Sequence, residues 1–211
     1  MRWLSISGIL FVVLFIVGFA LLGEVGDTPE EVLQFYQDNR ALSFVAFFCF
    51  AAAALAYVGF VAAVRSALAT AEPEPRALAP LGFGGGLVTA ALIVVSVAPV
   101  AALSDAAEES GGAASAETFY ALNTLGYPLI TVGIGFSSLL ALAVGLVALK
   151  TAVLPRWVGW VSVVAAPLIL IAVLFLPIFV FLGWVALVSV VLVARGPASS
   201  TRRRGPETAS S

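Results

Sequence analysis

The stretch TLGYPLITVGIGFSSLLALAVGLVALK, residues 124–150, decides the class of fold. It carries no charge before Lys150, and a run of roughly 20 mostly apolar residues is long enough to cross a bilayer as a helix. The rest of the chain has the same character, because 62% of its 211 residues are hydrophobic and 10% are charged. Soluble domains are about 45–50% apolar and about 25% charged. The sequence therefore predicts an all-α, polytopic membrane protein without a separate soluble domain.

Further apolar stretches bring the predicted number of transmembrane helices to six. The last two come from one charge-free stretch, residues 157–194, which is too long for a single span. We therefore place a tight turn near Pro177, and the alternative is one long helix kinked at this proline. The six spans, which together form a bundle over residues 1–195, are approximately residues 3–22, 41–64, 78–103, 124–149, 157–176 and 178–194.

Both ends of the chain need separate interpretation. The first apolar stretch is longer than the usual signal-peptide core of about 7–15 residues, so we expect a retained helix rather than a cleaved leader. Residues 196–211 are rich in Ser, Pro, Gly and Arg. This composition cannot bury enough apolar surface to offset the entropy of ordering, and it predicts a disordered cytoplasmic tail.

The positions of the charges predict the membrane topology. With six spans, nine of the ten Lys and Arg residues fall on one side, Arg40 being the exception, and nine of the twelve Asp and Glu residues fall on the other. Lys and Arg are enriched in cytoplasmic loops, so both termini are expected in the cytoplasm of a multi-pass protein of the bacterial plasma membrane. Tryptophan prefers the membrane interface. We expect Trp3, Trp157 and Trp160 at the inner boundary and Trp184 near the outer one.

A short amphipathic helix is predicted before the second span. Thr28 can cap it, Pro29 suits its first position, and Glu31 has the spacing of a capping box. Val32, Phe35 and Tyr36 follow at helical spacing and form an apolar face. This face could lie on the membrane surface or over the mouth of the bundle, and the simplest interpretation of the segment is a stiff elbow.

Span 124–149 contains small residues at strict four-residue spacing, which are Gly133, Ser137, Ala141 and Gly145. Such a stripe lets a second helix approach closely. Gly82, Gly86 and Ala90 form a similar stripe in span 78–103. We therefore predict close packing between these two helices.

An alternative interpretation of the same region is a polar cavity. Pro and Gly residues can loosen a membrane helix, and broken helices line binding sites in transporters, although hydroxyl groups also satisfy backbone carbonyls that proline frees. The side chains that would line such a cavity are Asn123, Thr131, Ser137 and Ser138, together with Thr89 of the preceding span.

The sequence lacks the usual groups of an enzyme or an ion-coupled transporter. It contains no histidine, its one cysteine, Cys49, lies in an apolar run, and no charged residue lies within a predicted span. Nucleophilic Ser or Thr needs an activating base, and ion-coupled transport uses ionisable groups inside the membrane. We expect no enzymatic activity, no cofactor, no metal site and no nucleic-acid partner.

One short pattern recurs along the chain. Phe35-Tyr36 followed by Asn39 is similar to Phe119-Tyr120 followed by Asn123, 84 residues later. The recurrence fits a parallel duplication of a two-helix hairpin. It also fits the general preference of outer interfaces for aromatic residues, and the sequence leaves both explanations open.

The chain resembles a family of uncharacterised six-span integral membrane proteins common in high-GC bacteria. Two motifs carry the resemblance, namely Glu30-Glu31-Val32 with the following Phe-Tyr and Asn-Arg, and Leu154-Pro155-Arg156-Trp157-Val-Gly159-Trp160. The resemblance implies the fold and the membrane location, and it implies no activity or site residue.

These observations lead to two functional hypotheses. The first is a non-enzymatic membrane component that binds membrane lipid, a partner membrane protein or a second copy of itself, with its small-residue helix faces as contact surfaces. The second is a carrier or channel for a small neutral or apolar solute along span 124–149.

Overall fold

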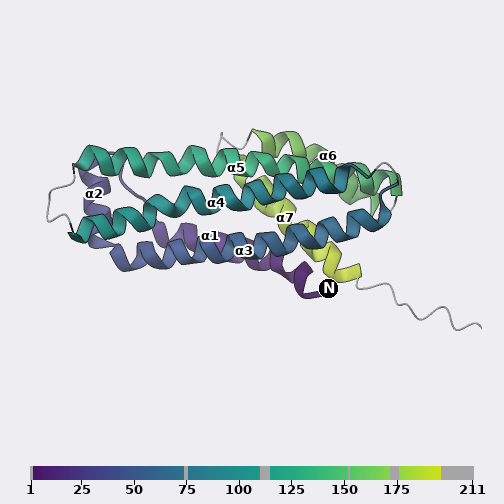
Figure 1. Ribbon diagram of the computed structural model, residues 1–211, viewed down its shortest axis with the longest axis horizontal. Coiled ribbons are helices and arrows are strands. Elements are labelled where there is room, and N and C mark those ends of the chain that lie inside the picture. The colour runs from purple at the N-terminus through teal and green to yellow at the C-terminus, as the bar shows by residue number, and fades with distance from the viewer. Residues whose placement is uncertain (1, 74–75, 110–114, 152, 172–175, 196–211) are drawn as a thin grey trace, which may run out of the picture.

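The computed structural model describes residues 2–73, 76–109, 115–151, 153–171 and 176–195. In these ranges the chain forms seven helices and no strand, in agreement with the predicted all-α class. Three long helices run side by side along the molecule, and the others pack around them (Figure 1). The helices are α1 (Arg2–Leu22), α2 (Pro29–Asp38), α3 (Arg40–Ala71), α4 (Leu78–Glu109), α5 (Ala116–Thr151), α6 (Arg156–Leu170) and α7 (Leu176–Arg195).

The helices have the length and surface of a membrane protein. Large apolar side chains point outward, and Leu55 and Phe48 of α3 are 75% and 65% exposed. Soluble monomers rarely expose large contiguous apolar patches, whereas a lipid-facing surface is made of them. Within the described ranges, four apolar helices are long enough to cross a membrane and two are shorter. The long ones are Arg40–Ala71, Leu78–Ala107, Ala116–Thr151 and Ile178–Arg195, and the shorter ones are Ile6–Leu22 and Arg156–Leu170.

Unequal helix lengths leave one end of the bundle thinner than the other. Helices α3 and α4 have 32 residues and α5 has 36, which corresponds to about 48–54 Å at 1.5 Å per residue. Helices α6 and α7, with 15 and 20 residues, lie along the half of the bundle that is far from α2 (Figure 1). Helix α1 also ends before it reaches α2. The end that carries α2 is therefore built mainly by α3, α4 and α5.

The break between the last two helices lies earlier than the predicted turn at Pro177. Helix α6 ends at Leu170 and α7 begins at Leu176, so Pro177 belongs to the first turn of α7. A helix tolerates proline in its first turn because the N–H groups there have no partner within the helix. The predicted cytoplasmic tail, residues 196–211, lies outside the described residues.

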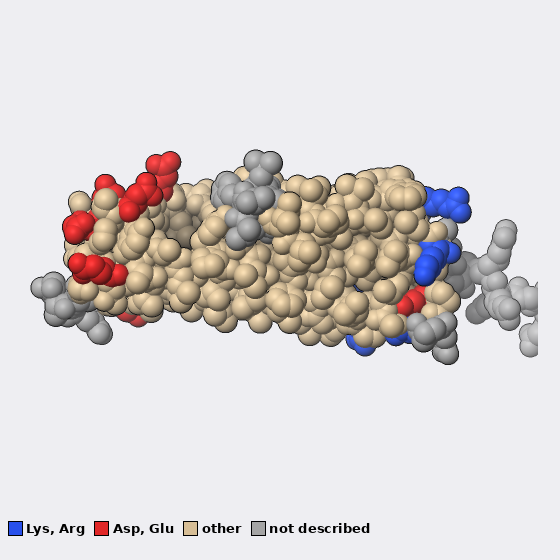
Figure 2. Space-filling view, turned by 90° about the horizontal axis from the view of Figure 1, so that it is seen from above, with Lys and Arg blue, Asp and Glu red and all other residues tan. Residues whose placement is uncertain are grey.

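The two ends of the bundle carry opposite charges. Asp and Glu side chains gather at the end with α2, and Lys and Arg side chains gather at the other end (Figure 2). We call these the acidic end and the basic end. Glu72 is a carboxylate at the basic end, where it is only 6% exposed and accepts hydrogen bonds from the backbone N–H groups of Leu78 and Ala79 at 2.7 and 2.9 Å. It caps the start of α4.

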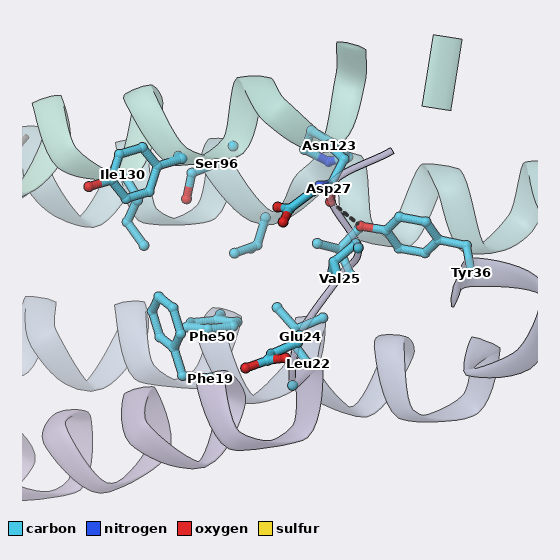
Figure 3. A pocket seen from close by; sticks show the side chains of 17 residues that line it. Phe19, Leu22, Glu24, Val25, Asp27, Tyr36, Phe50, Ser96, Asn123 and Ile130 are labelled. Carbon is cyan, nitrogen blue, oxygen red and sulfur yellow. Dashed lines mark hydrogen bonds between the residues drawn. The ribbon is translucent and has the colours of Figure 1, made fainter. Parts of the chain in front are cut away.

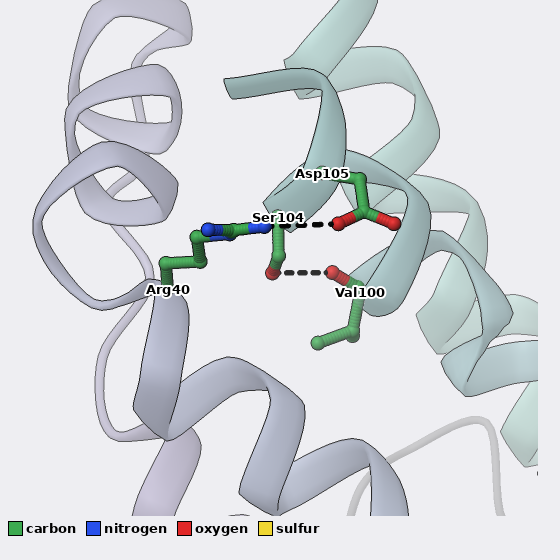
Figure 4. A network of polar contacts seen from close by, with 4 residues as sticks. All are labelled: Arg40, Val100, Ser104 and Asp105. Carbon is green, nitrogen blue, oxygen red and sulfur yellow. Dashed lines mark hydrogen bonds and ion pairs between the residues drawn. The ribbon is translucent and has the colours of Figure 1, made fainter. Parts of the chain in front are cut away.

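Arg40 is the one cation that the predicted topology left on the acidic side. Its Nη2 atom lies 3.3 Å from Oδ1 of Asp105 (Figure 4). Its guanidinium also lies 5.6 Å from the ring centroid of Phe44. In the adjacent turn, the Ser104 hydroxyl donates to the carbonyl of Val100 at 2.7 Å. Arg40 thus joins the start of α3 to the end of α4 and is locally neutralised.

Trp184 packs in the core of the bundle and does not face lipid as an interfacial anchor would. It is 2% exposed, and its indole Nε1–H donates to the hydroxyl of Ser162 in α6 at 2.9 Å. It lies edge-on to Phe60 within the aromatic core shared by α1, α3 and α7. Trp157 and Trp160 are 52% and 62% exposed, as expected of residues at an interface. Whether a tryptophan faces lipid or core depends on helix rotation, which sequence position alone does not reveal.

Candidate binding pocket at the acidic end

A cavity of about 800 Å³ lies inside the acidic end, where the shorter helices no longer fill the bundle (Figure 3). Helix α1 ends there because Gly23 adopts a φ of 59°, a left-handed conformation that glycine accepts readily. The chain then crosses the top of the cavity toward α2. The residues that line the cavity are Phe19, Leu22, Gly23, Glu24, Val25, Gly26, Asp27, Tyr36, Phe50, Ser96, Val97, Pro99, Val100, Asn123, Gly126, Tyr127 and Ile130.

The deeper wall of this pocket is apolar. Phe19 of α1 and Phe50 of α3 meet edge to face with their centroids 5.5 Å apart. Val97 of α4 and Ile130 of α5 complete the wall, and both are at least 94% buried. Four helices therefore contribute one largely apolar surface, which can hold a hydrocarbon group.

The side of the pocket nearest α2 is polar. The Tyr36 hydroxyl donates to Oδ1 of Asn123 at 2.8 Å, and this bond joins α2 to α5. Burial raises the pKa of the Tyr36 hydroxyl above its ordinary value, so this group remains a hydrogen-bond donor. The carboxylates of Glu24 and Asp27 belong to exposed residues on the same side (Figure 3). The pocket is thus amphipathic along its length.

Helix α2 covers the mouth of the pocket through its apolar face. Val32 and Tyr36 are fully buried, and they form a small hydrophobic cluster with Val100, Leu103 and Phe119 of α4 and α5. Of the two placements that the sequence left open for this face, the structure shows packing over the mouth of the bundle.

The start of α2 is held by the predicted capping box. The backbone N–H groups of Thr28 and Asp27 donate to the carboxylate of Glu31 at 3.1 and 3.0 Å, and the N–H of Glu31 donates to the Thr28 hydroxyl at 3.4 Å. The bond from the Thr28 backbone is the main reason why the pKa of the Glu31 carboxyl lies below its ordinary value. The capping box stiffens the segment that crosses the pocket, because it ties Asp27 to the first turn of α2.

Two of the hydroxyl groups predicted to line a cavity, those of Thr89 and Ser137, are bonded to each other in the packed core. Ser137 Oγ lies 2.7 Å from the Tyr57 hydroxyl and 2.9 Å from Thr89 Oγ1. Thr89 also donates to the carbonyl oxygen of Gly133 at 2.8 Å. Tyr57, Thr89 and Ser137 are all fully buried. They form a hydrogen-bonded chain between α3, α4 and α5, and Tyr57 is the member that sequence reasoning missed.

The other predicted cavity residues lie in two different places. Asn123 lines the 800 Å³ pocket, as described above. Thr131 and Ser138 line a second pocket of about 330 Å³ beside Leu170 of α6. Ser138 is seven positions after Thr131, so the two share one helix face, while Ser137 faces the core. The five polar residues therefore do not form one continuous path.

The small-residue stripe of α5 packs closely, but it packs against two helices. A Cβ atom added at Gly133 would lie 2.7 Å from Cβ of Leu92 in α4, and one added at Gly145 would lie 2.6 Å from Val163 in α6. Ala141 between them is fully buried. The stripe of α4 also has a second neighbour besides α5, because a Cβ atom added at Gly86 would lie 2.6 Å from Val61 of α3.

The recurring Phe-Tyr pattern has two different local structures. The first copy belongs to α2, which ends at Asp38 before α3 begins, whereas the second copy lies within the continuous helix α5. Tyr36 of the first copy donates its hydroxyl hydrogen bond to Asn123 of the second. The two copies thus meet at the pocket without occupying equivalent positions.

Most of the pocket residues were not identified from the sequence. In the sequence, Glu24 and Asp27 are indistinguishable from other loop charges, and Phe19 and Phe50 lie within the apolar stretches of two predicted spans. The sequence signal that could have indicated the pocket is Gly23, which ends α1 early, followed by the separate cap of α2. Together they place a short polar connection over the bundle.

Comparison with known proteins identifies a family but no characterised relative. The family model for a domain of unknown function, DUF4386, matches residues 6–201. No curated protein and no solved structure matches the chain.

Proposed function

The chain belongs to the DUF4386 family, and on that premise we propose that it is a six-span plasma-membrane protein that binds a membrane amphiphile at its acidic end. The proposed spans are α1 and α3 through α7, with α2 on the outer side. The segregation of Lys and Arg to one end supports this topology, since these residues mark the cytoplasmic side. Helix α1 begins and α7 ends toward the basic end (Figure 1), which is consistent with cytoplasmic termini.

The 800 Å³ pocket is the observation that carries the proposed binding function. Its volume lies within the range of about 300–1,000 Å³ that is typical of small-molecule sites. Its apolar wall and polar mouth match a molecule that has a hydrocarbon part and a polar headgroup. The long helices extend beyond a hydrocarbon core of about 30 Å, so the pocket would lie near the outer headgroup level, where such molecules are abundant.

A binding role agrees with the chemistry of the pocket better than catalysis does. The chain contains no histidine, and the Ser96 hydroxyl at the pocket already donates to the carbonyl of Ile93 at 2.8 Å. Without an adjacent base, a serine hydroxyl is a weak nucleophile. The alternative role, a solute path along α5, receives less support because Ser137 is engaged by Tyr57 and Thr89.

Native mass spectrometry of protein extracted into lipid discs from its own membrane tests the proposal. We expect a stoichiometric lipid-like adduct on the wild type. The adduct should be lost in Val97→Phe, because a larger side chain enters the pocket from a position that is 5% exposed. Val95→Phe is the matched control, since Val95 lies two residues earlier in the same helix, faces the outer surface and is 50% exposed.

Two outcomes would contradict the proposed function. One is an adduct that persists unchanged in Val97→Phe, which would place the bound lipid outside the pocket. The other is the absence of any adduct together with a stoichiometric partner protein, which would indicate an accessory subunit instead.

A further inference from the structure

We infer that the amphiphile bound at the acidic end carries a cationic headgroup, which binds between the carboxylates of Glu24 and Asp27. This inference rests on the proposed function and adds the chemical class of the ligand. An ammonium group attached to a hydrocarbon chain is the simplest molecule of this kind.

The charges that line the pocket have one sign. Among the residues that the structure describes, Glu24 and Asp27 are the only charged ones that line the pocket. Within the described residues, neither carboxylate has a hydrogen-bond or ion-pair partner, whereas Glu31 is used in the capping box and Asp105 binds Arg40. Two uncompensated carboxylates beside a cavity attract a cation and repel an anion.

The groups that could attract an anionic headgroup are already engaged. The N-terminus of α2 is a possible anion site because its N–H groups are not used within the helix. Glu31 and Thr28 occupy that site, however, through the capping box. Arg40 does not line the pocket and is bound to Asp105. A phosphate or carboxylate headgroup would therefore meet no cationic partner among the lining residues.

The arrangement of the pocket also sets the orientation of the ligand. Glu24 and Asp27 lie between Tyr36 on one side and Phe19, Phe50, Ser96 and Ile130 on the other (Figure 3). A headgroup between the carboxylates leaves its chain directed toward the aromatic and aliphatic wall.

Three amphiphiles with the same dodecyl chain distinguish the headgroups. Protein in phosphatidylcholine discs is titrated with dodecylammonium, with neutral dodecylglycerol and with dodecyl sulfate, and bound molecules are counted by native mass spectrometry. The pocket variant is Glu24→Gln/Asp27→Asn. The matched control is Glu30→Gln/Glu117→Gln, which removes two exposed carboxylates that do not line the pocket.

We expect the wild type to bind dodecylammonium most tightly. The pocket variant should bind dodecylammonium about tenfold more weakly, because each partly solvated charge contributes a modest, salt-sensitive attraction. The control variant should bind it as the wild type does, and dodecylglycerol binding should be equal in all three proteins. Equal loss in the pocket and control variants would overturn the inference, since it would show only a general surface-charge effect.

The failure of this inference is distinguishable from the failure of the proposed function. If Val97→Phe abolishes dodecylglycerol binding but the pocket variant retains full dodecylammonium binding, the pocket holds amphiphiles without selecting a cation. If Val97→Phe changes the binding of none of the three probes, the pocket is not an amphiphile site, and both proposals are wrong.

Discussion

Substitution of Ser137 by alanine should destabilise the bundle more than removal of the neighbouring Tyr57 hydroxyl does. Either oxygen can donate in the Tyr57–Ser137 and Ser137–Thr89 pairs, whereas Thr89 donates to the carbonyl of Gly133. We therefore assign the direction in which Tyr57 donates to Ser137 and Ser137 donates to Thr89. In this order every hydroxyl proton is used. Ser137→Ala removes the acceptor of Tyr57, which is fully buried.

The expected magnitudes follow from which group loses its partner. Tyr57→Phe removes the first donor and leaves no unpaired proton, so it should cost about 0.6 kcal/mol, the average for a hydrogen bond within a membrane. Ser137→Ala leaves the Tyr57 hydroxyl unpaired and should cost about 2 kcal/mol, within the range for an unsatisfied buried donor. The double variant removes both groups and should cost only about 1 kcal/mol. Phenylalanine at position 57 should therefore partly rescue Ser137→Ala.

Equilibrium unfolding in mixed micelles of dodecyl maltoside and dodecyl sulfate, followed by circular dichroism, measures these free energies. Ser189→Ala is the matched control, because the Ser189 hydroxyl is also buried but has no hydrogen-bond partner within the described residues. It should change the free energy of unfolding by less than about 0.5 kcal/mol, because no bond is lost. If Ser137→Ala costs no more than Ser189→Ala, or if the double variant is the least stable of the set, the proposed direction of the chain is wrong.

Three further changes test other parts of the structure. Gly145→Leu should separate α5 from α6, because a Cβ atom alone would already lie 2.6 Å from Val163. We expect the free energy of unfolding in the same assay to fall by about 1–3 kcal/mol, as is typical of overpacking. Unchanged stability would contradict the close contact. Thr28→Ala removes the side-chain cap of α2 and should cost about 1 kcal/mol locally, seen as faster amide hydrogen exchange in α2 but not in α4. Arg40→Gln breaks an exposed ion pair with Asp105 and should cost at most about 1 kcal/mol, and cysteine-accessibility mapping should show the same topology as in the wild type.

Some structural features could be predicted because they depend on nearby residues. The all-α class follows from the apolar stretches, and the capping box of α2 follows from the spacing of Thr28 and Glu31. The close approach of Gly133 and Gly145 to neighbouring helices follows from their small size. Each of these depends on composition or on residues within one or two helical turns.

Other features could not be predicted because they depend on how the helices rotate and where they end. Tryptophan is typical of membrane interfaces, yet Trp184 faces Ser162 in the core. Thr131 and Ser137 are only six residues apart, yet one lines a side pocket and the other belongs to a buried hydroxyl chain. A change of one position along a helix turns a side chain by about 100°, so a sequence pattern does not identify the neighbour.

The sequence by itself determined that the helices of this protein are apolar enough for lipid and that its two ends carry opposite charges. Hydrophobic stretches and the positions of Lys and Arg act through transfer free energy and charge, and neither depends on which helix packs beside which. Only the tertiary structure decided that there is a pocket. The pocket exists because α1 stops at Gly23, because α6 and α7 lie along the other half of the bundle, and because Tyr36 donates to Asn123 across it. These are relations between residues far apart in the chain, and packing alone brings them together.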